Sequence, residues 1–169
     1  MLIQLGFAYF ATVIILCALM VVASKNPVHS ALFMLPLFFH VAGVFVMLNA
    51  EFLAAVQVLV YAGAILVLFL FVIMLLNVRQ EEKRSRFQAK WAVTLPVGLT
   101  LGGFLMTILV RSSFTGKQGV DTIEAVKQLG NSQAIGMALY TEYLFPFEIA
   151  SIILLVAMVG AIVLAKKKL

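Results

Sequence analysis

Apolar runs about 20 residues long recur along this chain and restrict the folds open to it. A helix of about 20 apolar residues spans the hydrocarbon core of a bilayer, since each residue rises by roughly 1.5 Å. Hydrophobic residues make up 64% of the chain and charged residues 11%, whereas soluble domains are roughly 45–50% apolar and about 25% charged. Five runs qualify: residues 3–24, 29–49, 52–77, 91–110 and 147–165. We therefore predict an all-α integral membrane protein with five transmembrane helices, forming a single membrane domain over residues 1–169.

The basic residues are distributed unequally between the two sets of loops. Three of them, Arg111, Lys117 and Lys127, follow the fourth predicted helix. The other nine follow the first, third and fifth: Lys25, Arg79, Lys83, Arg84, Arg86, Lys90, Lys166, Lys167 and Lys168. Lys and Arg accumulate on the cytoplasmic side of membrane proteins. This asymmetry predicts an N-terminus outside and a C-terminus in the cytoplasm, and it explains the net charge of +5 without nucleic-acid binding.

The reactive side chains are too few and too far apart for catalysis by the chain alone. Cys17 is the only cysteine, so no intrachain disulfide or paired-cysteine metal motif is possible. His29 and His40 are the only histidines. They lie roughly 16 Å apart along one predicted helix, so they cannot ligate one haem from opposite sides. We expect neither a metal site nor a cofactor site in this chain.

The connections between the predicted helices carry further local signals. The turn at residues 49–51 is short enough to make the second and third helices antiparallel neighbours. Short surface helices are expected within residues 121–143. Asp121 and Glu124 have the spacing of a capping box, Gly130 is a helix-stop signal, and a second short helix is expected after Ser132.

Four polar residues inside or beside the apolar runs are candidates for a proton path, because burying polar groups in a membrane is costly. His40 is interpreted either as a neutral imidazole bonded to a neighbouring helix or as a proton relay. Glu148 follows Pro146 by two residues, so we expect it in the first turn of the fifth helix, where it either stabilises the helix N-terminus or carries protons. Gln57 and Tyr61, four residues apart, are expected to share one face of the third helix.

Three consecutive small residues, Ala62, Gly63 and Ala64, follow Tyr61 at the midpoint of the third predicted helix. Glycine destabilises a helix interior by about 1 kcal/mol relative to alanine. Two structures account for it: a notch where another helix packs closely, or a π-bulge, which often marks a functional site. Helical periodicity alone does not choose between them.

The stretches EFLAAVQVLVYAGAILVLFLFVIMLLN and YLFPFEIASIILLVAMVGAIVLA resemble subunit J, called chain 6 in mitochondria, of the proton-pumping NADH:quinone oxidoreductase, respiratory complex I. The resemblance covers the whole chain and is most specific at residues 60–64 and 146–151. It implies a non-catalytic membrane-arm subunit, with a π-bulge at Tyr61–Gly63 that switches to α-helix and gates a water path near the quinone site. Some relatives have glutamate where this chain has Gln57, so a carboxylate is not essential there.

The resemblance also implies the surroundings of the chain. Its expected partners are the quinone-site subunit, the small subunits A and K, and antiporter-like subunits. FMN, iron–sulfur clusters and quinone are expected in those partner subunits, and the expected location is a bacterial plasma membrane. Two alternatives remain open: the equivalent subunit of a membrane hydrogenase or of a multi-subunit cation/proton antiporter, and a purely structural spacer.

Overall fold

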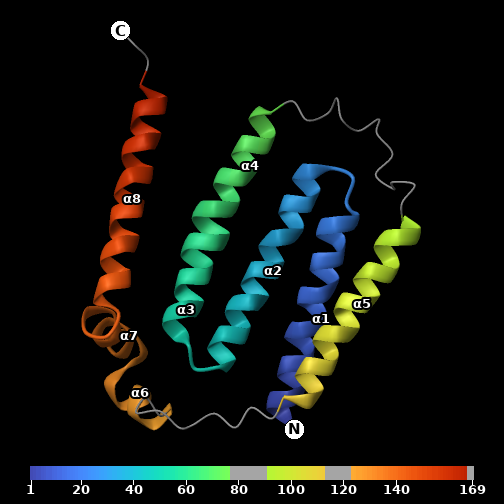
Figure 1. The fold of residues 1–169 in the computed structure, drawn as a ribbon, viewed down its shortest axis with the longest axis horizontal. Coiled ribbons are helices and arrows are strands. Elements are labelled where there is room, and N and C mark those ends of the chain that lie inside the picture. Colours follow the sequence, from blue (N-terminus) through green and yellow to red (C-terminus); the bar gives the residue numbers. More distant parts are fainter. Residues whose placement is uncertain (77–90, 113–122, 167–169) are drawn as a thin grey trace. The chain divides into compact units, whose positions relative to one another are not determined.

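The computed structural model describes residues 1–76, 91–112 and 123–166, and the regular structure within these ranges is helical. It divides into two compact units, Met1–Gly119 and Val120–Leu169. The elements are labelled in Figure 1: α1 Leu2–Ala23, α2 Pro27–Met47, α3 Glu51–Val56, η1 Gln57–Ile65, α4 Leu66–Leu75, α5 Trp91–Arg111, α6 Ile123–Leu129, α7 Asn131–Tyr140 and α8 Leu144–Ala165. The single domain expected from the sequence stays a prediction.

In the first unit, α2 is the middle helix of three that run side by side (Figure 1). It contacts α1 on one side and the continuous helix formed by α3, η1 and α4 on the other. Within the described ranges, four helical stretches are long and apolar enough to cross a membrane: Leu2–Ala23, Pro27–Met47, Glu51–Leu75 and Leu144–Ala165. A fifth, shorter apolar stretch, Leu95–Arg111, belongs to α5.

The apolar core of the described residues is very small. Its buried members are Ala31, Ala42, Ala54, Ala62 and Leu66, and most large hydrophobic side chains are exposed. Helices that are apolar all round need lipid or other proteins around them. We therefore expect lipid or other proteins to cover these exposed apolar side chains.

Helix α2 begins at Pro27, two residues earlier than the apolar run predicts. The side chain of Asn26 accepts a hydrogen bond of 2.9 Å from the backbone N–H of Val28, and Pro27 is the first helical residue. Asparagine is a favoured N-cap, and proline suits the first position because its missing N–H would have no partner there. This Asn-Pro signal sets the start of the helix more directly than hydropathy does.

The turn between α2 and α3 is closed by backbone hydrogen bonds around Asn49. Asn49 has a positive φ of 58°. The N–H of Ala50 donates to the carbonyl of Phe45 at 2.9 Å, and the N–H of Asn49 donates to that of Val46 at 3.0 Å. This pair of bonds is the Schellman motif, with asparagine in the left-handed position that glycine usually takes. It makes α2 and α3 antiparallel neighbours, as the short connection predicts.

Helices α1 and α2 approach closely at glycine. A β-carbon on Gly43 would overlap the Phe10 ring, and one on Gly6 would lie 3.3 Å from the terminal methyl of Met47. Small residues at interfaces let membrane helices pack at short range. Gly43 therefore provides the recess that receives Phe10.

The second unit contains α6, α7 and α8. Gly130, with φ of 88°, separates α6 from α7, so its predicted role as a helix stop agrees with the backbone. The capping residue Asp121 and the side chain of Glu124 lie outside the described residues. Tyr140 of α7 and Phe147 of α8 make an edge-on ring contact with centroids 5.2 Å apart.

Helix α8 starts at Leu144, three residues before the predicted start at residue 147. Pro146 does not delay the start, because it lies in the first turn, where backbone N–H groups have no partner within the helix. The prediction placed the helix after the proline and was wrong on this point.

A π-helical segment as the candidate functional site

The centre of the third long helix is π-helical. Segment η1, Gln57–Ile65, contains Tyr61, Ala62, Gly63 and Ala64, and the N–H of Leu66 donates to the carbonyl of Tyr61, five residues earlier. A π-helix is uncommon and usually occurs as a single turn. This one is nine residues long, and the bond from Leu66 to Tyr61 stays within the backbone of the same helix, where the interior of a membrane requires backbone groups to be paired.

The π segment changes which residues of the third helix face α2. The buried residues are Ala54, Gln57, Ala62 and Leu66, so the step from Gln57 to Ala62 is five residues. In a continuous α-helix, residues five apart lie about 140° from one another around the axis. The wider π turn brings Gln57 and Ala62 onto the same side, with exposed fractions of 8% and 4%.

The prediction that Gln57 and Tyr61 share a face stays a prediction, and the two side chains differ in burial. Gln57 is the buried polar residue of the described part of the chain, whereas Tyr61 is 46% exposed. In an α-helix, residues four apart are neighbours. In the π segment, the residue after Tyr61 takes the buried position instead.

Gly63 lies on the exposed side of η1. A β-carbon built on Gly63 would meet the carbonyl oxygen of Val58 at 3.3 Å, and no side chain of another helix comes within 4 Å of it in the described structure. No described helix therefore fills a notch at this glycine. The close neighbour of Gly63 is the backbone of its own π turn.

Tyr61 makes the aromatic contact between the third helix and α2. Its ring lies edge-on to that of Phe38, with centroids 5.9 Å apart and planes at 66°. Edge-on aromatic pairs stabilise a contact by about 0.5–1.5 kcal/mol beyond the area that they bury. Phe38 therefore holds the tyrosine at the side of the α2 interface.

His40 lies on a different side of α2, toward α1. Its Nδ1 donates to the carbonyl of Pro36 at 2.7 Å, and its Nε2 lies 3.4 Å from the Tyr9 hydroxyl. Because a carbonyl oxygen can only accept, Nδ1 carries the hydrogen, and Nε2 faces the Tyr9 hydroxyl. His40 and Phe38 are two residues apart, about 200° around the helix, so the histidine is separated from Tyr61 and η1.

Glu148, the fourth predicted polar residue, belongs to the second unit and is exposed. It is the fifth residue of α8, and the first turn contains no acidic residue. Stabilisation by the helix N-terminus is confined to about the first turn. The expected place of Glu148 in the first turn is therefore wrong, and both interpretations of its role stay predictions.

Sequence reasoning missed Phe38 and Tyr9, which contact the predicted residues Tyr61 and His40. The chain has 14 phenylalanines and 4 tyrosines, so neither residue type carries a signal of its own. Pro36 does not account for the His40 bond, because its missing N–H leaves the carbonyl of Leu32 without a donor, whereas His40 bonds the carbonyl of Pro36 itself. Within the described ranges, no group of three or more His, Cys, Asp or Glu side chains is placed to hold a metal ion.

In the described residues these features define a helical membrane protein with little core of its own and with a π-helical segment in its third long helix. Residues 17–164 match the family model of NADH-ubiquinone/plastoquinone oxidoreductase chain 6. The chain belongs to this family.

Curated relatives agree over nearly the whole chain. NADH-quinone oxidoreductase subunit J of Rhodobacter capsulatus is 40% identical over 160 residues, which are 94% of this chain and 79% of the relative. Subunit J of Rickettsia prowazekii is 36% identical, with 96% and 80% covered. NAD(P)H-quinone oxidoreductase chain 6 of Synechocystis is 38% identical, with 98% and 81% covered.

Proposed function

We propose that this chain is a membrane-arm subunit of a proton-translocating NADH:quinone oxidoreductase and that η1 is a two-state element that helps couple quinone reduction to proton translocation. The observation that carries the proposal is the π-helical segment Gln57–Ile65 within the family-matched residues 17–164. The chain does not itself catalyse electron transfer. FMN, iron–sulfur clusters and quinone bind to partner subunits, which include the quinone-site subunit, the small subunits A and K and the antiporter-like subunits.

The proposed arrangement has five membrane spans in a bacterial plasma membrane, formed by α1, α2, the third long helix, α5 and α8. The N-terminus lies outside and the C-terminus in the cytoplasm, because the nine-to-three distribution of Lys and Arg favours this orientation. The extent of exposed apolar surface supports a subunit that is enclosed by lipid and other subunits.

The two states of η1 differ in helical register. If η1 becomes α-helical while Gln57 stays in place, the following half of the helix turns by about 100°. Tyr61 and Ile65 then take the positions of Ala62 and Leu66 against α2. Tyrosine is far larger than alanine, so the two packings are discrete. We propose that this rotation opens and closes a water path along the polar residues Gln57 and Tyr61.

Gly63→Val tests the switch. A side chain at residue 63 crowds the Val58 carbonyl, which lies 3.3 Å from an ideal β-carbon in the π form. We expect the assembled complex to oxidise NADH normally with an artificial acceptor but to lose coupled quinone reduction several-fold, with a smaller loss for Gly63→Ala. Gly160→Val is the control, because nothing lies within 4 Å of a β-carbon there. Normal pumping by assembled Gly63→Val disproves the switch, and selective failure to assemble favours a packing notch against a partner.

A further inference from the structure

The ring contact between Phe38 and Tyr61 belongs to the π form of η1. Tyr61 is 46% exposed and beside the α2 interface, while its neighbour Ala62 is in the interface. The Phe38 ring, 5.9 Å away between centroids, lies edge-on against this peripheral position. A rotation by about 100° toward α-helical register carries the tyrosine ring out of this position and into the place of Ala62.

Helix α2 is itself weakened beside this contact. Pro36 has no backbone N–H, so the carbonyl of Leu32 receives no hydrogen bond from position 36. Two residues after Phe38, the His40 side chain bonds the carbonyl of Pro36 at 2.7 Å. Phe38 thus follows the missing backbone bond of α2 by two residues, and its ring contacts Tyr61 of the π-helical segment.

We propose that Phe38 is a positioning residue that sets the balance between the π and α forms of η1 by holding Tyr61 at the edge of the α2 interface. This inference rests on the proposed function, because it assumes that both forms occur. According to this inference, α2 influences the conformation of η1, because the Phe38 ring stabilises the π form.

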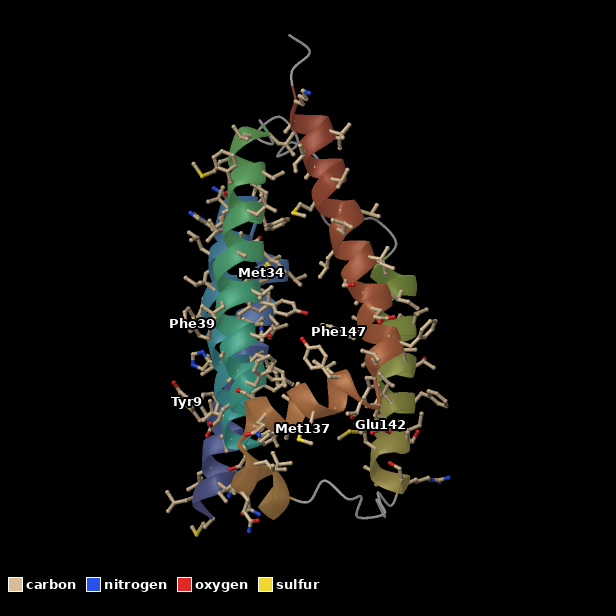
Figure 2. The ribbon with its side chains drawn as sticks, turned by 90° about the vertical axis from the view of Figure 1, so that its left-hand side faces the viewer. Tyr9, Met34, Phe39, Met137, Glu142 and Phe147 are labelled. Atoms are coloured by element: carbon tan, nitrogen blue, oxygen red, sulfur yellow. The ribbon has the colours of Figure 1, made fainter. Side chains whose placement is uncertain are left out.

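The test compares Phe38→Leu with Phe39→Leu in the assembled complex. Leucine keeps an apolar side chain but removes the ring. Phe39 is the matched control, because it is the next residue of α2, about 100° further round, and projects from the helix layer with 49% exposure (Figure 2). Phe38→Tyr is the conservative variant, since it retains the ring.

The readout is the ratio of complexes with a π-helical η1 to those with an α-helical one, counted by cryo-electron microscopy at rest and during turnover. We expect Phe38→Leu to lower this ratio of π to α forms by roughly 2- to 12-fold, which is the change in an equilibrium constant that corresponds to losing the energy of one aromatic pair. Phe38→Tyr restores the ratio, and Phe39→Leu leaves it at the wild-type value. A residue that only fills space would not change this ratio selectively.

An unchanged ratio in Phe38→Leu, with both forms present in the wild type, overturns the role of Phe38 and leaves the proposed function standing. A single form of η1 in the wild type at rest and during turnover overturns both proposals. If Phe38→Leu does not assemble, Phe38→Met, with its adaptable apolar side chain, serves for the same comparison and is judged by the same two outcomes.

Discussion

The Phe10 ring lies against the backbone of Gly43, in the space that a β-carbon on Gly43 would occupy. The same ring is 5.8 Å from the imidazole of His40, between centroids. One glycine thus determines how closely α1 approaches α2, and it brings Tyr9 within reach of His40. The α1–α2 pair is the part of the fold where close packing can be tested most directly.

Gly43→Val is expected to destabilise the α1–α2 pair by about 1–3 kcal/mol, the usual cost of overpacking. Thermal unfolding of the purified complex measures the loss. Phe10→Ala in the same chain makes room for the valine, so the double variant should lose less than the sum of the two single variants. Strictly additive losses would show that the ring and the glycine do not interact.

Tyr9→Phe removes the hydroxyl that lies 3.4 Å from His40 Nε2. The hydrogen bond is long and Tyr9 is 58% exposed, so we expect a loss of stability of at most about 0.6 kcal/mol, the average for hydrogen bonds between membrane helices. His40→Leu should cost more, because it also removes the 2.7 Å bond to the Pro36 carbonyl. Melting temperatures of the two variants check this order.

The same two variants separate the two interpretations of His40. A histidine that only bonds neighbouring groups predicts normal proton pumping per quinone reduced in both variants, once the amount of assembled complex is equalised. Fewer protons pumped per quinone reduced in Tyr9→Phe, whose stability is expected to be nearly unchanged, would instead indicate that Tyr9 and His40 carry protons.

Glu148→Gln tests the exposed carboxylate of α8. Because Glu148 follows the first turn, its neutralisation should leave the helix and the assembly of the complex unchanged. If Glu148 belongs to the proton path, we expect pumping to fall several-fold, because glutamine cannot carry the proton. Glu142→Gln, at an exposed glutamate between α7 and α8, is the control. Normal pumping by Glu148→Gln would remove Glu148 from the proton path.

The orientation has its own test. A reporter fused after Leu169 should behave as cytoplasmic, and one inserted at Gly119 as external, because nine of the twelve basic residues lie in the loops predicted to be cytoplasmic. Access to Leu169 from outside intact cells, together with protection of Gly119, would reverse the topology.

Hydropathy is a local property, and it was enough to locate the helices to within about three residues. Both ends of α1, α2 and α5 were close to prediction, and the short helices α6 and α7 lie in the segment expected for them. The larger error, at the start of α8, arose because proline was treated as a boundary although the first turn of a helix accepts it. The small residues around Gly63 and the family resemblance together indicated an irregular turn within the segment that is π-helical.

Which side chains meet depended on tertiary structure. A π turn and an α turn have nearly the same local composition, but they place every later residue about 100° apart around the helix. Packing of the third helix against α2 selects Gln57 and Ala62 for burial, leaves Tyr61 beside Phe38, and separates this group from the His40–Tyr9 pair. Spacing along the chain was enough to select most of these residues as candidates. Which of them contact one another depends on the backbone register of the third helix and on contacts between helices, and these contacts join residues that are distant in sequence.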